Sequence, residues 1–584
     1  MSANTEPVAS PHSHYVPVLE RHQPSLPILS GSRSSSVTDT RDIPSSNVHL
    51  QSPEPRPDQY AALPTSIGNL LRSWSVLRWR LSRSAFSVPL PFLTPRFDLK
   101  LGDLILTTPL SLILITVTAL QAKDRDVSSS GTPLTIAMLF VFALAVRNNS
   151  VLLALTGISF ERALLYHKIV ALVTIILTAL HALAYLLARD RNEEADQSGR
   201  AFTGIVAFAA MAILLIFSIG PIRRKFFEFF VRFHWSLFLV VIVFAVIHGA
   251  ALALVGVVPW FIDMLFRLVY RPRIYAKGSL LNGKKPSATE FPSNVVSTKR
   301  MGVIARDQIS VSALAGDIIR IQFPRVRKDT GEEFKYEAGQ YAFLCVPAIS
   351  SLQWHSFTIS SSPHEPLVTF HVKALGDWTH KLQSMSSAAI VAPFDVLVDG
   401  PYGNISIDIH SINTYAHFAL FSGGIGVTPM RSIVNWFHYQ VKEGRTIDRV
   451  HFVWSVRDRD TIEAFIGDQG REPGELNSYY FPHELGVDQG GAFSTELYLT
   501  RGERDVESAW VDQQLESCLR FNCRPDIAAT LRNLGEQAKQ SGKDRVAVLV
   551  CGPAALVQEV TATSMELYKQ MKVTFDVHRE LFEF

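Results

Sequence analysis

Two apolar segments of the chain each carry a pair of histidines with the same spacing. The segment YHKIVALVTIILTALHALAY holds His167 and His181, and RFHWSLFLVVIVFAVIHGA holds His234 and His248. A fourteen-residue separation places two rings roughly 21 Å apart along a helix and nearly on one face. Ionisable residues are costly within membrane-spanning helices and usually serve a function there. The pattern therefore favours a membrane bundle whose histidines do chemistry.

Two helices with histidines at matching depths can hold two flat groups between them. Imidazole is a common axial ligand of haem iron, so we interpret the four side chains as ligands of two haems. On this interpretation His167 and His234 hold one haem, and His181 and His248 hold the other. The alternative is that the four rings are polar residues satisfied inside a helix bundle.

Six apolar spans are predicted, each near the length of about 20 residues that a bilayer requires. They cover about 101–122, 128–146, 165–188, 202–220, 233–250 and 252–270. Basic residues gather in the loops on one side, as in RRK at 223–225, whereas the opposite loops are balanced or slightly acidic. The positive-inside rule then puts both termini in the cytosol. His167 and His234 are thereby assigned to the inner side of the membrane, and His181 and His248 to the outer side.

The remaining composition sets the context of this membrane domain, predicted over 101–272. Residues 1–64 are rich in Ser and Pro and indicate a disordered cytosolic tail, with no cleaved signal peptide. Residues 65–100 include an amphipathic helix, either on the membrane surface or packed on a soluble domain. The net charge of +3 says little about partners, and no basic tract suggests nucleic acid, so no nucleic-acid partner is expected. The four cysteines lie in the second half without zinc-ligand spacing, which fits a reducing compartment.

Short alternating segments from about residue 298 to 405 predict an antiparallel barrel. One of them, WHSFTISSSP, combines aromatic and hydroxyl side chains, and it can lay His355, Phe357 and Thr358 against a flat heterocycle. The following stretch HVKALGDWTHKL offers the cation Lys373. Its GDWT motif can open a helix whose free N–H groups hold a phosphate.

Strand and helix segments alternate from 415 to 584 and predict a parallel α/β domain. In HFALFSGGIGVTPMRSIVNWF the glycines Gly423, Gly424 and Gly426 allow a phosphate to approach the backbone. Thr428 and Pro429 suit the first turn of the helix that follows. The next strand ends at Arg457, a partner for a nucleotide 2′-phosphate.

A second turn of the same kind closes the last predicted unit. RVAVLVCGPAALVQEV sets Cys551, Gly552 and Pro553 at the end of a strand. Ligands of open parallel sheets bind at the carboxyl ends of strands, where both turns lie. Glycine-rich turns also serve packing, but the two together favour nucleotide binding.

Taken together and in this order, these motifs resemble the ferric reductase and NADPH oxidase superfamily of flavocytochromes b over roughly residues 95–584. RNNSVLLALTGISFERALLYH and RRKFFEFFVRFH are most similar to the fungal ferric reductase branch, while WHSFTISS and VKALGDWT occur in the oxidase branch as well. The resemblance implies a transmembrane haem bundle, a FAD-binding barrel and an NADPH-binding domain like that of ferredoxin reductases. It also implies that the terminal Phe584 stacks over the flavin ring.

The resemblance assigns residues to the two soluble cofactors. Those implied for FAD are His355, Phe357, Thr358, Ile359, His371, Lys373, Asp377, Trp378, Thr379 and Phe584. Those implied for NADPH are Gly423, Gly424, Gly426, Val427, Thr428, Pro429, Arg457, Arg524, Cys551, Gly552 and Pro553. Three features depart from the family pattern. Ser356 replaces a proline, Cys523 stands where glycine is usual before Arg524, and the polar stretch 466–493 matches nothing in the family.

The cofactors imply a route for electrons, because flavin converts a two-electron hydride donor into a one-electron supply for haem. We expect an integral membrane enzyme, in the plasma membrane, that passes electrons from cytosolic NADPH through FAD and two haems to ferric or cupric ions or chelates. The first alternative is an NADPH oxidase that forms superoxide. The second is a membrane scaffold that binds haem or conducts protons, with the soluble half regulatory.

Overall fold

The computed structural model describes Trp74 and, with gaps, residues 88–580. The gaps fall at 91, 98, 147–159, 189–197, 266–300, 305–308, 327–332, 352, 387–393, 404, 406, 411–413, 467–490, 505–511 and 513–514. The predicted tail at 1–64, most of the predicted amphipathic helix and Phe584 lie outside the described residues.

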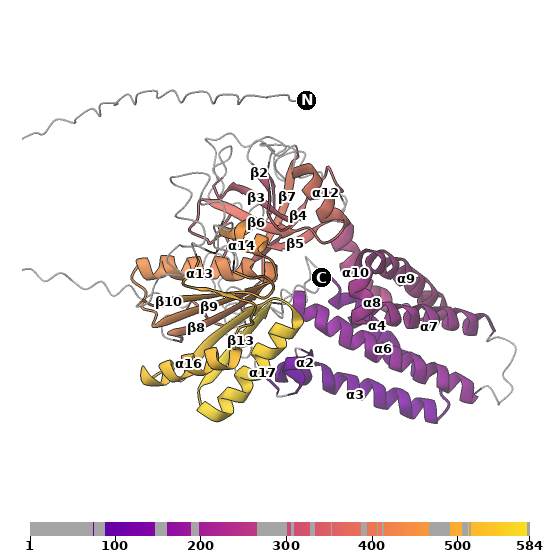
Figure 1. The fold of residues 1–584 in the computed structure, drawn as a ribbon. Coiled ribbons are helices and arrows are strands. Elements are labelled where there is room, and N and C mark those ends of the chain that lie inside the picture. The colour runs from indigo at the N-terminus through magenta and orange to yellow at the C-terminus, as the bar shows by residue number, and fades with distance from the viewer. Residues whose placement is uncertain are drawn as a thin grey trace, which may run out of the picture. The chain divides into compact units, whose positions relative to one another are not determined.

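The first half of the described chain is helical (Figure 1). Five of its helices are long and apolar enough to cross a membrane. These are α3 (Leu101–Lys123), α4 (Val127–Leu144), α6 (Phe160–Ala188), α7 (Ser198–Ser218) and α9 (Phe227–His248). Two short helices, α2 (Leu93–Phe97) and α8 (Gly220–Lys225), precede α3 and α9. Five of the predicted spans thus correspond to helices of suitable length.

The prediction of a sixth span at 252–270 is not confirmed. The structure has a 13-residue helix there, α10 (Ala253–Leu265), and residues 266–300 are not described. At about 1.5 Å per residue such a helix reaches roughly 20 Å, short of the 30 Å hydrocarbon core. Helix α10 packs on α4 so closely that a Cβ on Gly256 would lie 2.2 Å from the carbonyl oxygen of Leu139.

The apolar side chains of these helices lie in two environments, either buried between helices or exposed on the outside of the bundle. Leu134, Ala137, Leu177 and Ile242 are buried between helices. Other leucines and isoleucines, such as Leu112 and Ile113, are more than half exposed. A helix satisfies its own backbone hydrogen bonds, so such side chains can face lipid without a polar cost.

The predicted barrel is present as two antiparallel sheets. One has the order β1 (Met301–Ile304), β7 (Val396–Tyr402), β4 (Tyr341–Cys345) and β5 (His355–Thr358). The other has the order β2 (Ser310–Leu314), β3 (Ile318–Pro324) and β6 (Leu367–Lys373). A bridge between Ile359 and Phe370 joins β5 to β6. Helix α12 (Asp377–Ser386) follows β6 and buries Trp378 and Leu382 in the core between the sheets.

The last part of the chain forms a six-stranded parallel sheet. Its order is β11 (Leu519–Phe521), β10 (Phe493–Leu499), β9 (Arg449–Val456), β8 (His417–Gly423), β12 (Arg545–Cys551) and β13 (Thr574–Glu580). The chain runs from β8 outward to β11 and then returns to β12 on the other side of β8. The junction of β8 and β12 is therefore the topological switch point, where open α/β sheets bind ligands.

Helices cover both faces of this sheet, as the unbroken apolar strands require. Phe418 and Leu420 of β8 pack with helix α13 (Val427–Lys442). The alternate residues Ala419 and Phe421 pack with helices α16 (Ile527–Gln540) and α17 (Ala554–Met571). The 3₁₀ turn η6 (Gly424–Gly426) joins β8 to α13, and α14 (Arg459–Ile466) follows β9. The predicted succession of helical membrane region, barrel and α/β domain is confirmed.

Candidate functional site

The four histidines form two facing pairs between α6 and α9. The ring centroids of His167 and His234 are 6.5 Å apart, and those of His181 and His248 are 5.8 Å apart. An atom bound to two imidazoles at about 2 Å from each nitrogen needs ring centres about 6 Å apart. The partners within each pair are those predicted from the sequence.

Hydrogen bonds orient three of these rings. Nδ1 of His167 lies 2.8 Å from the carbonyl oxygen of Val141, and Nδ1 of His248 lies 2.8 Å from that of Arg200. A carbonyl oxygen only accepts, so each Nδ1 donates and Nε2 carries the lone pair. Such bonds fix ring orientation and raise the basicity of a ligating nitrogen.

The third ring, His181, is held by a hydroxyl group. The Ser130 hydroxyl donates to the carbonyl oxygen of Val127, so it accepts from Nδ1 of His181 at 2.8 Å. The fourth ring differs, since the buried Nδ1 of His234 has no hydrogen-bond partner among the described residues. The ring of His234 instead lies beside that of Phe230, at 5.2 Å between centroids.

Two glycines lie against the outer pair, and at one of them, Gly204, a side chain would crowd the imidazole. A Cβ on Gly204 of α7 would lie 2.8 Å from Cε1 of His248, whereas one on Gly131 of α4 would lie 3.5 Å from Cε1 of His181. Within the described residues no group of three or more His, Cys, Asp or Glu side chains could hold a metal ion. The histidine pairs, with Nε2 available and space preserved around the rings, fit the axial ligand set of two haems.

The predicted flavin strand is β5. His355, Ser356 and Phe357 are half-buried along it, and Thr358 is buried at its end. The ring of Trp378 lies under the strand, with its centroid 4.5 Å from that of His355. Because Trp378 is only 3% exposed, it supports β5 from the barrel core. The strand thus presents two half-buried aromatic rings, which suits a flat heterocycle.

The GDWT motif opens helix α12 as predicted, and Asp377 is its exposed first residue. The hydroxyl of Thr379, however, accepts from the backbone N–H of Leu375 and of Gly376, each at 2.9 Å. Thr379 therefore closes its own turn and occupies the N–H group of Gly376, the first residue of the motif.

Three other residues assigned to FAD differ in exposure. Ile359 is fully buried in the barrel core, and His371 is 4% exposed. Lys373, at the end of β6, is half-buried. Burial holds the pKa of His371 well below the ordinary histidine value, and Arg431 and Arg320 act in the same direction. The assignment of all these residues to FAD stays a prediction.

The two predicted nucleotide turns meet at the switch point of the parallel sheet. Gly423 ends β8, and Cys551 ends the neighbouring strand β12. A Cβ on Gly423 would lie 2.5 Å from Cδ of Pro553, and one on Gly426 would lie 2.6 Å from the carbonyl oxygen of Cys551. These two glycines therefore allow the turns to touch.

Gly424 plays a different part in the first turn. Its φ is +56°, a left-handed conformation, and a Cβ there would meet nothing within 4 Å. The open space beside this backbone is where a phosphate can approach. Val427, Thr428 and Pro429 are buried in the first turn of α13, and the Thr428 hydroxyl donates to the carbonyl oxygen of Ile425 at 3.1 Å.

Two arginines lie at the same edge of the sheet. Arg457 follows the carboxyl end of β9, Arg524 follows β11, and both are exposed. Each can reach an anionic group brought to the strand ends. Cys551 is buried, and burial raises the pKa of its thiol, with Glu580 acting in the same direction. The thiol is therefore protonated at neutral pH.

Sequence reasoning missed one residue that supports the first turn. The indole Nε1 of Trp454, a fully buried residue of β9, donates to the carbonyl oxygen of Gly424 at 2.9 Å. In the sequence, Trp454 is one apolar residue of the segment VHFVWSV and was assigned no role. A hydrogen bond to a turn 30 residues earlier has no signal in the sequence.

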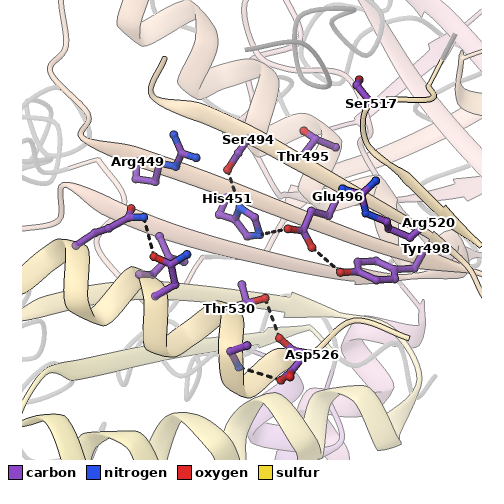
Figure 2. Close-up of a pocket in the computed structure, with 14 residues that line it drawn as sticks. Arg449, His451, Ser494, Thr495, Glu496, Tyr498, Ser517, Arg520, Asp526 and Thr530 are labelled. Carbon is purple, nitrogen blue, oxygen red and sulfur yellow. Dashed lines mark hydrogen bonds and ion pairs between the residues drawn. The ribbon is translucent and has the colours of Figure 1, made fainter. Parts of the chain in front are cut away.

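A cavity of about 630 Å³ lies elsewhere in the α/β domain, over one face of β9 and β10 beside α16 (Figure 2). His451 contacts Ser494 at 2.6 Å and Glu496 at 3.7 Å, and the Tyr498 hydroxyl donates to Glu496 at 2.5 Å. These polar groups satisfy one another. The cavity contains none of the residues predicted to bind a nucleotide.

Family models match three parts of the chain. The ferric reductase like transmembrane component matches residues 130–246, an FAD-binding domain matches 303–406, and the ferric reductase NAD binding domain matches 415–468 and 492–565. The break in the third match falls within the polar stretch 466–493, which resembled nothing in the family.

Curated relatives align with most of the chain. The heavy chain of a superoxide-generating NADPH oxidase from Dictyostelium discoideum is 26% identical over 466 residues, covering 73% of this chain and 82% of that protein. A dual oxidase of Drosophila melanogaster is 25% identical over 451 residues, covering 71% of this chain but 27% of that protein. A respiratory burst oxidase homolog protein B of Solanum tuberosum is 25% identical over 512 residues, covering 73% of this chain and 54% of that protein. The chain thus spans between about a quarter and about four fifths of the length of these relatives.

Among solved structures, a ferredoxin NADP+ reductase from Neisseria gonorrhoeae aligns with 48% of this chain and 99% of its own, at 13% identity and a TM-score of 0.33. That likeness is too slight to bear on function. The family matches and the histidine pairs together identify haem, FAD and a nicotinamide dinucleotide as the cofactors of the chain. The chain belongs to the ferric reductase and NADPH oxidase superfamily of membrane oxidoreductases.

Proposed function

We propose that the protein carries electrons from NADPH on the cytosolic side of a membrane, through FAD and two haems, to an acceptor on the opposite side. The observation that carries the proposal is the stacking of two facing histidine pairs along α6 and α9. The members of each pair are fourteen residues from those of the other pair along their helices, which separates the two sites by roughly 21 Å. That spacing is suited to passing an electron across a bilayer in two stages.

The soluble half supplies the binding residues. The nucleotide provides a hydride, and flavin converts it into single electrons. Gly424 leaves the backbone of η6 open to a phosphate, and Arg457 favours NADPH over NADH because its guanidinium can pair with a 2′-phosphate. The half-buried rings of His355 and Phe357 line a strand suited to a flat heterocycle. No side chain in this scheme needs to act as a catalytic acid or base.

The outer histidine pair determines how an acceptor is reached. His181 and His248 would together hold the iron of the outer haem, and two imidazole ligands would leave no site on that iron for an acceptor. The haem would then supply single electrons to an acceptor that does not bind the iron. Neither histidine has to move, which agrees with the hydrogen bonds that orient both rings.

For the acceptor we propose dioxygen, reduced to superoxide by one electron, so that each NADPH yields two superoxide ions. The names of the relatives support this choice, because they are dual oxidases, respiratory burst oxidase homologs and a superoxide-generating NADPH oxidase. Our expectation of ferric or cupric acceptors rested on similarity of loop sequences. Ferric chelates remain the second candidate, since two of the three family models are ferric reductase components.

The basic residues of α8 support the orientation. Arg223, Arg224 and Lys225 follow α7 at one end of the bundle, as the positive-inside rule requires of a cytosolic loop. His234 lies nine residues beyond Lys225 and falls on that inner side. We place both termini in the cytosol and the protein in the plasma membrane.

The acceptors are separated by assaying the purified protein in lipid with NADPH. A dioxygen reductase produces cytochrome c reduction that superoxide dismutase abolishes. A ferric reductase reduces ferric chelate without oxygen, at a rate that superoxide dismutase does not change. A visible spectrum without reducible low-spin haem would instead favour the scaffold alternative and contradict the electron-transfer proposal.

A further inference from the structure

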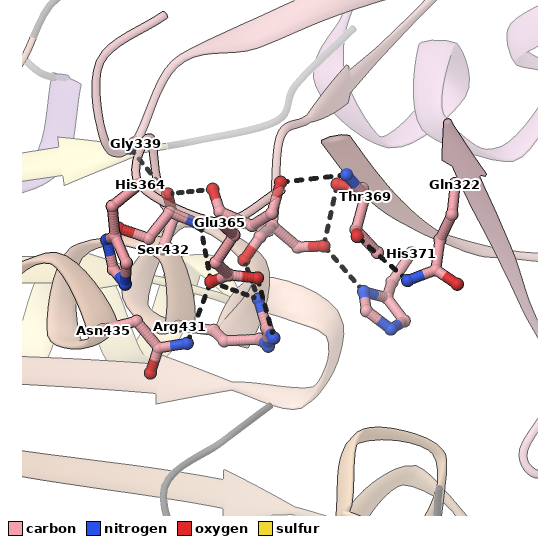
Figure 3. A network of polar contacts seen from close by, with 12 residues as sticks. Gln322, Gly339, His364, Glu365, Thr369, His371, Arg431, Ser432 and Asn435 are labelled. Carbon is pink, nitrogen blue, oxygen red and sulfur yellow. Dashed lines mark hydrogen bonds and ion pairs between the residues drawn. The ribbon is translucent and has the colours of Figure 1, made fainter. Parts of the chain in front are cut away.

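A buried ion pair joins the antiparallel barrel to the α/β domain (Figure 3). Arg431 of α13 lies 3.4 Å and 3.5 Å from the two carboxylate oxygens of Glu365, which is in the turn between β5 and β6. Their side chains are 1% and 4% exposed. Nη1 of Arg431 also donates to the carbonyl oxygen of Ser360 at 2.5 Å.

Two neighbouring side chains of α13 reinforce the pair. Nδ2 of Asn435 donates to Glu365 at 3.1 Å, and the Ser432 hydroxyl donates to the carbonyl oxygen of Ser361 at 2.7 Å. Arg431 and Asn435 are four residues apart, so they lie on one face of the helix. Side chains of α13 therefore bind the turn 360–365 through several hydrogen bonds.

The ion pair connects two segments predicted to bind cofactors. The turn 360–365 begins two residues after Thr358, the end of the flavin strand. Arg431 lies five residues after Gly426, the end of the phosphate turn. A shift of α13 relative to the barrel would therefore change the distance between the two candidate sites.

A second contact between the same domains lies beside the first. The Ser360 hydroxyl is 2.7 Å from Nδ1 of His371, and the ring of His371 lies 4.3 Å from that of Phe465 in α14. Ser360 thus takes part in both contacts. A residue assigned to FAD from the sequence is, in the structure, wedged between the domains.

A buried ion pair is a poor means of stabilising a fold. Removing two charges from water costs several kcal/mol per ion, and apolar residues of similar volume are often as stable. Burial accordingly raises the pKa of Glu365, and Arg431 opposes this effect. Such a pair does fix the relative position of the two segments that carry it, because a carboxylate and a guanidinium interact in few geometries.

We propose that Arg431 and Glu365 are positioning residues for hydride transfer, which hold the nucleotide turn in register with the flavin strand. The inference rests on the proposed function, because it presumes that a nicotinamide reduces a flavin between these segments. Hydride transfer needs reacting atoms about 3–3.5 Å apart, and a misplacement of about 1 Å costs about a hundredfold in rate. Nucleotide affinity depends on groups within the α/β domain and is not set by the pair.

The test is the double variant Arg431→Met with Glu365→Gln in the full-length protein in lipid. Both charges are removed together, because a single substitution leaves an unpaired buried charge. We expect wild-type haem and FAD contents and an NADP+ dissociation constant within twofold of wild type. Anaerobic stopped-flow should show at least tenfold slower flavin reduction by NADPH, while haem reduction after photoreduction of the flavin keeps its rate. Hydrogen exchange without any nucleotide should show lost protection at 360–365.

Two further variants keep the test decisive. Ser432→Ala removes two hydrogen bonds between the domains without burying a charge: the one to the carbonyl oxygen of Ser361 and a longer one, 3.5 Å, from the backbone N–H of Gly339. About threefold slower flavin reduction is expected when these bonds are lost and the others remain. The control is Arg545→Met with Asp576→Asn, which removes an ion pair of 2.7 Å between β12 and β13 at the opposite end of the strands. This control should reduce flavin at the wild-type rate.

The outcomes separate the inference from the proposed function. Flavin reduction at the wild-type rate in the folded double variant would overturn the inference and leave the proposed function intact. If the double variant does not fold, a wild-type rate in Ser432→Ala overturns it instead. No reduction of flavin by NADPH in the wild type would overturn both.

Discussion

Gly204 of α7 and His248 of α9 are in such close contact that the glycine has no room for a side chain. A Cβ at position 204 would lie 2.8 Å from Cε1 and 3.2 Å from Nδ1 of the imidazole. The same imidazole is hydrogen-bonded through Nδ1 to the carbonyl oxygen of Arg200, one turn earlier in α7. Helix α7 therefore orients the ring of His248 through Arg200 and leaves space for it at Gly204.

Gly204→Ala should displace His248 and lower the content of the outer haem. Forcing one methyl group into a packed site costs about 1–3 kcal/mol, and here the group that must yield is the ligand ring. The measurement is the haem-to-protein ratio from the pyridine haemochrome spectrum. Gly131→Ala is the matched control, because its Cβ would lie 3.5 Å from His181, an ordinary contact. Equal haem ratios in the two variants would refute this role of Gly204.

Replacing His181 or His248 with alanine should remove the outer haem and stop electron delivery across the membrane. Reduction of FAD by NADPH should continue, because both nucleotide turns and the flavin strand lie in the soluble domains. Haem spectra and stopped-flow flavin absorbance follow the two steps separately. Full acceptor reduction in either variant would mean that the outer pair is not on the electron path.

Gly424→Ala should raise the KM for NADPH by about tenfold, which is about 1.4 kcal/mol. Alanine disfavours the left-handed φ of +56°, at a cost of about 1–2 kcal/mol, and the turn would relax away from the phosphate. Gly444→Ala is the control, with a φ of +95° at the end of α13 and nothing within 4 Å of its Cβ. It should lower stability by a similar amount without changing the KM. An unchanged KM in Gly424→Ala would assign the turn to packing alone.

His364 should make the interface between barrel and α/β domain weaker in acid. Burial lowers its pKa to about 4, and the charges of Arg431, Arg325 and Lys442 act in the same direction. A histidine whose pKa is lower in the folded state than in the unfolded state stabilises the fold above about pH 6.5. That contribution is lost as the pH falls from 6.5 toward 4, because the unfolded state binds the proton first.

The measurement is flavin release on heating, at pH 7.5 and at pH 5, for wild type and His364→Gln. The wild type should lose more thermal stability between the two pH values than the variant. The ring stacks on Tyr439 at 4.4 Å between centroids, so the variant is expected to be less stable at both pH values. An identical pH dependence in the two proteins would exclude His364 as the titrating group.

The sequence predicted those features that a local pattern encodes. The fourteen-residue spacing of His167 and His181, matched by His234 and His248, was enough to predict which rings face each other. The GGIG and CGP motifs follow apolar strands, so parallel-sheet topology put them together at one edge. The chain also contains a sixth apolar segment, but only 13 residues of it are described as helix.

Features that depend on packing between distant segments could not be predicted. Gly204 reads as an ordinary small residue in an apolar helix, and only the position of α9 shows what it accommodates. Arg431 and Glu365 are 66 residues apart in different domains, with no periodicity to relate them. The GDWT motif was expected to offer free N–H groups to a phosphate, but its threonine, Thr379, binds the N–H of Gly376 through its own hydroxyl.

The most direct test of the account uses proteoliposomes with NADPH added outside and an acceptor trapped inside. For vesicles whose soluble domains face outward, we predict that external NADPH reduces trapped cytochrome c by way of superoxide, or trapped ferric chelate directly. His248→Ala vesicles should leave either trapped acceptor oxidised while their FAD is still reduced. Reduction confined to acceptors on the same side as NADPH, at equal rates in wild type and His248→Ala, would contradict the account.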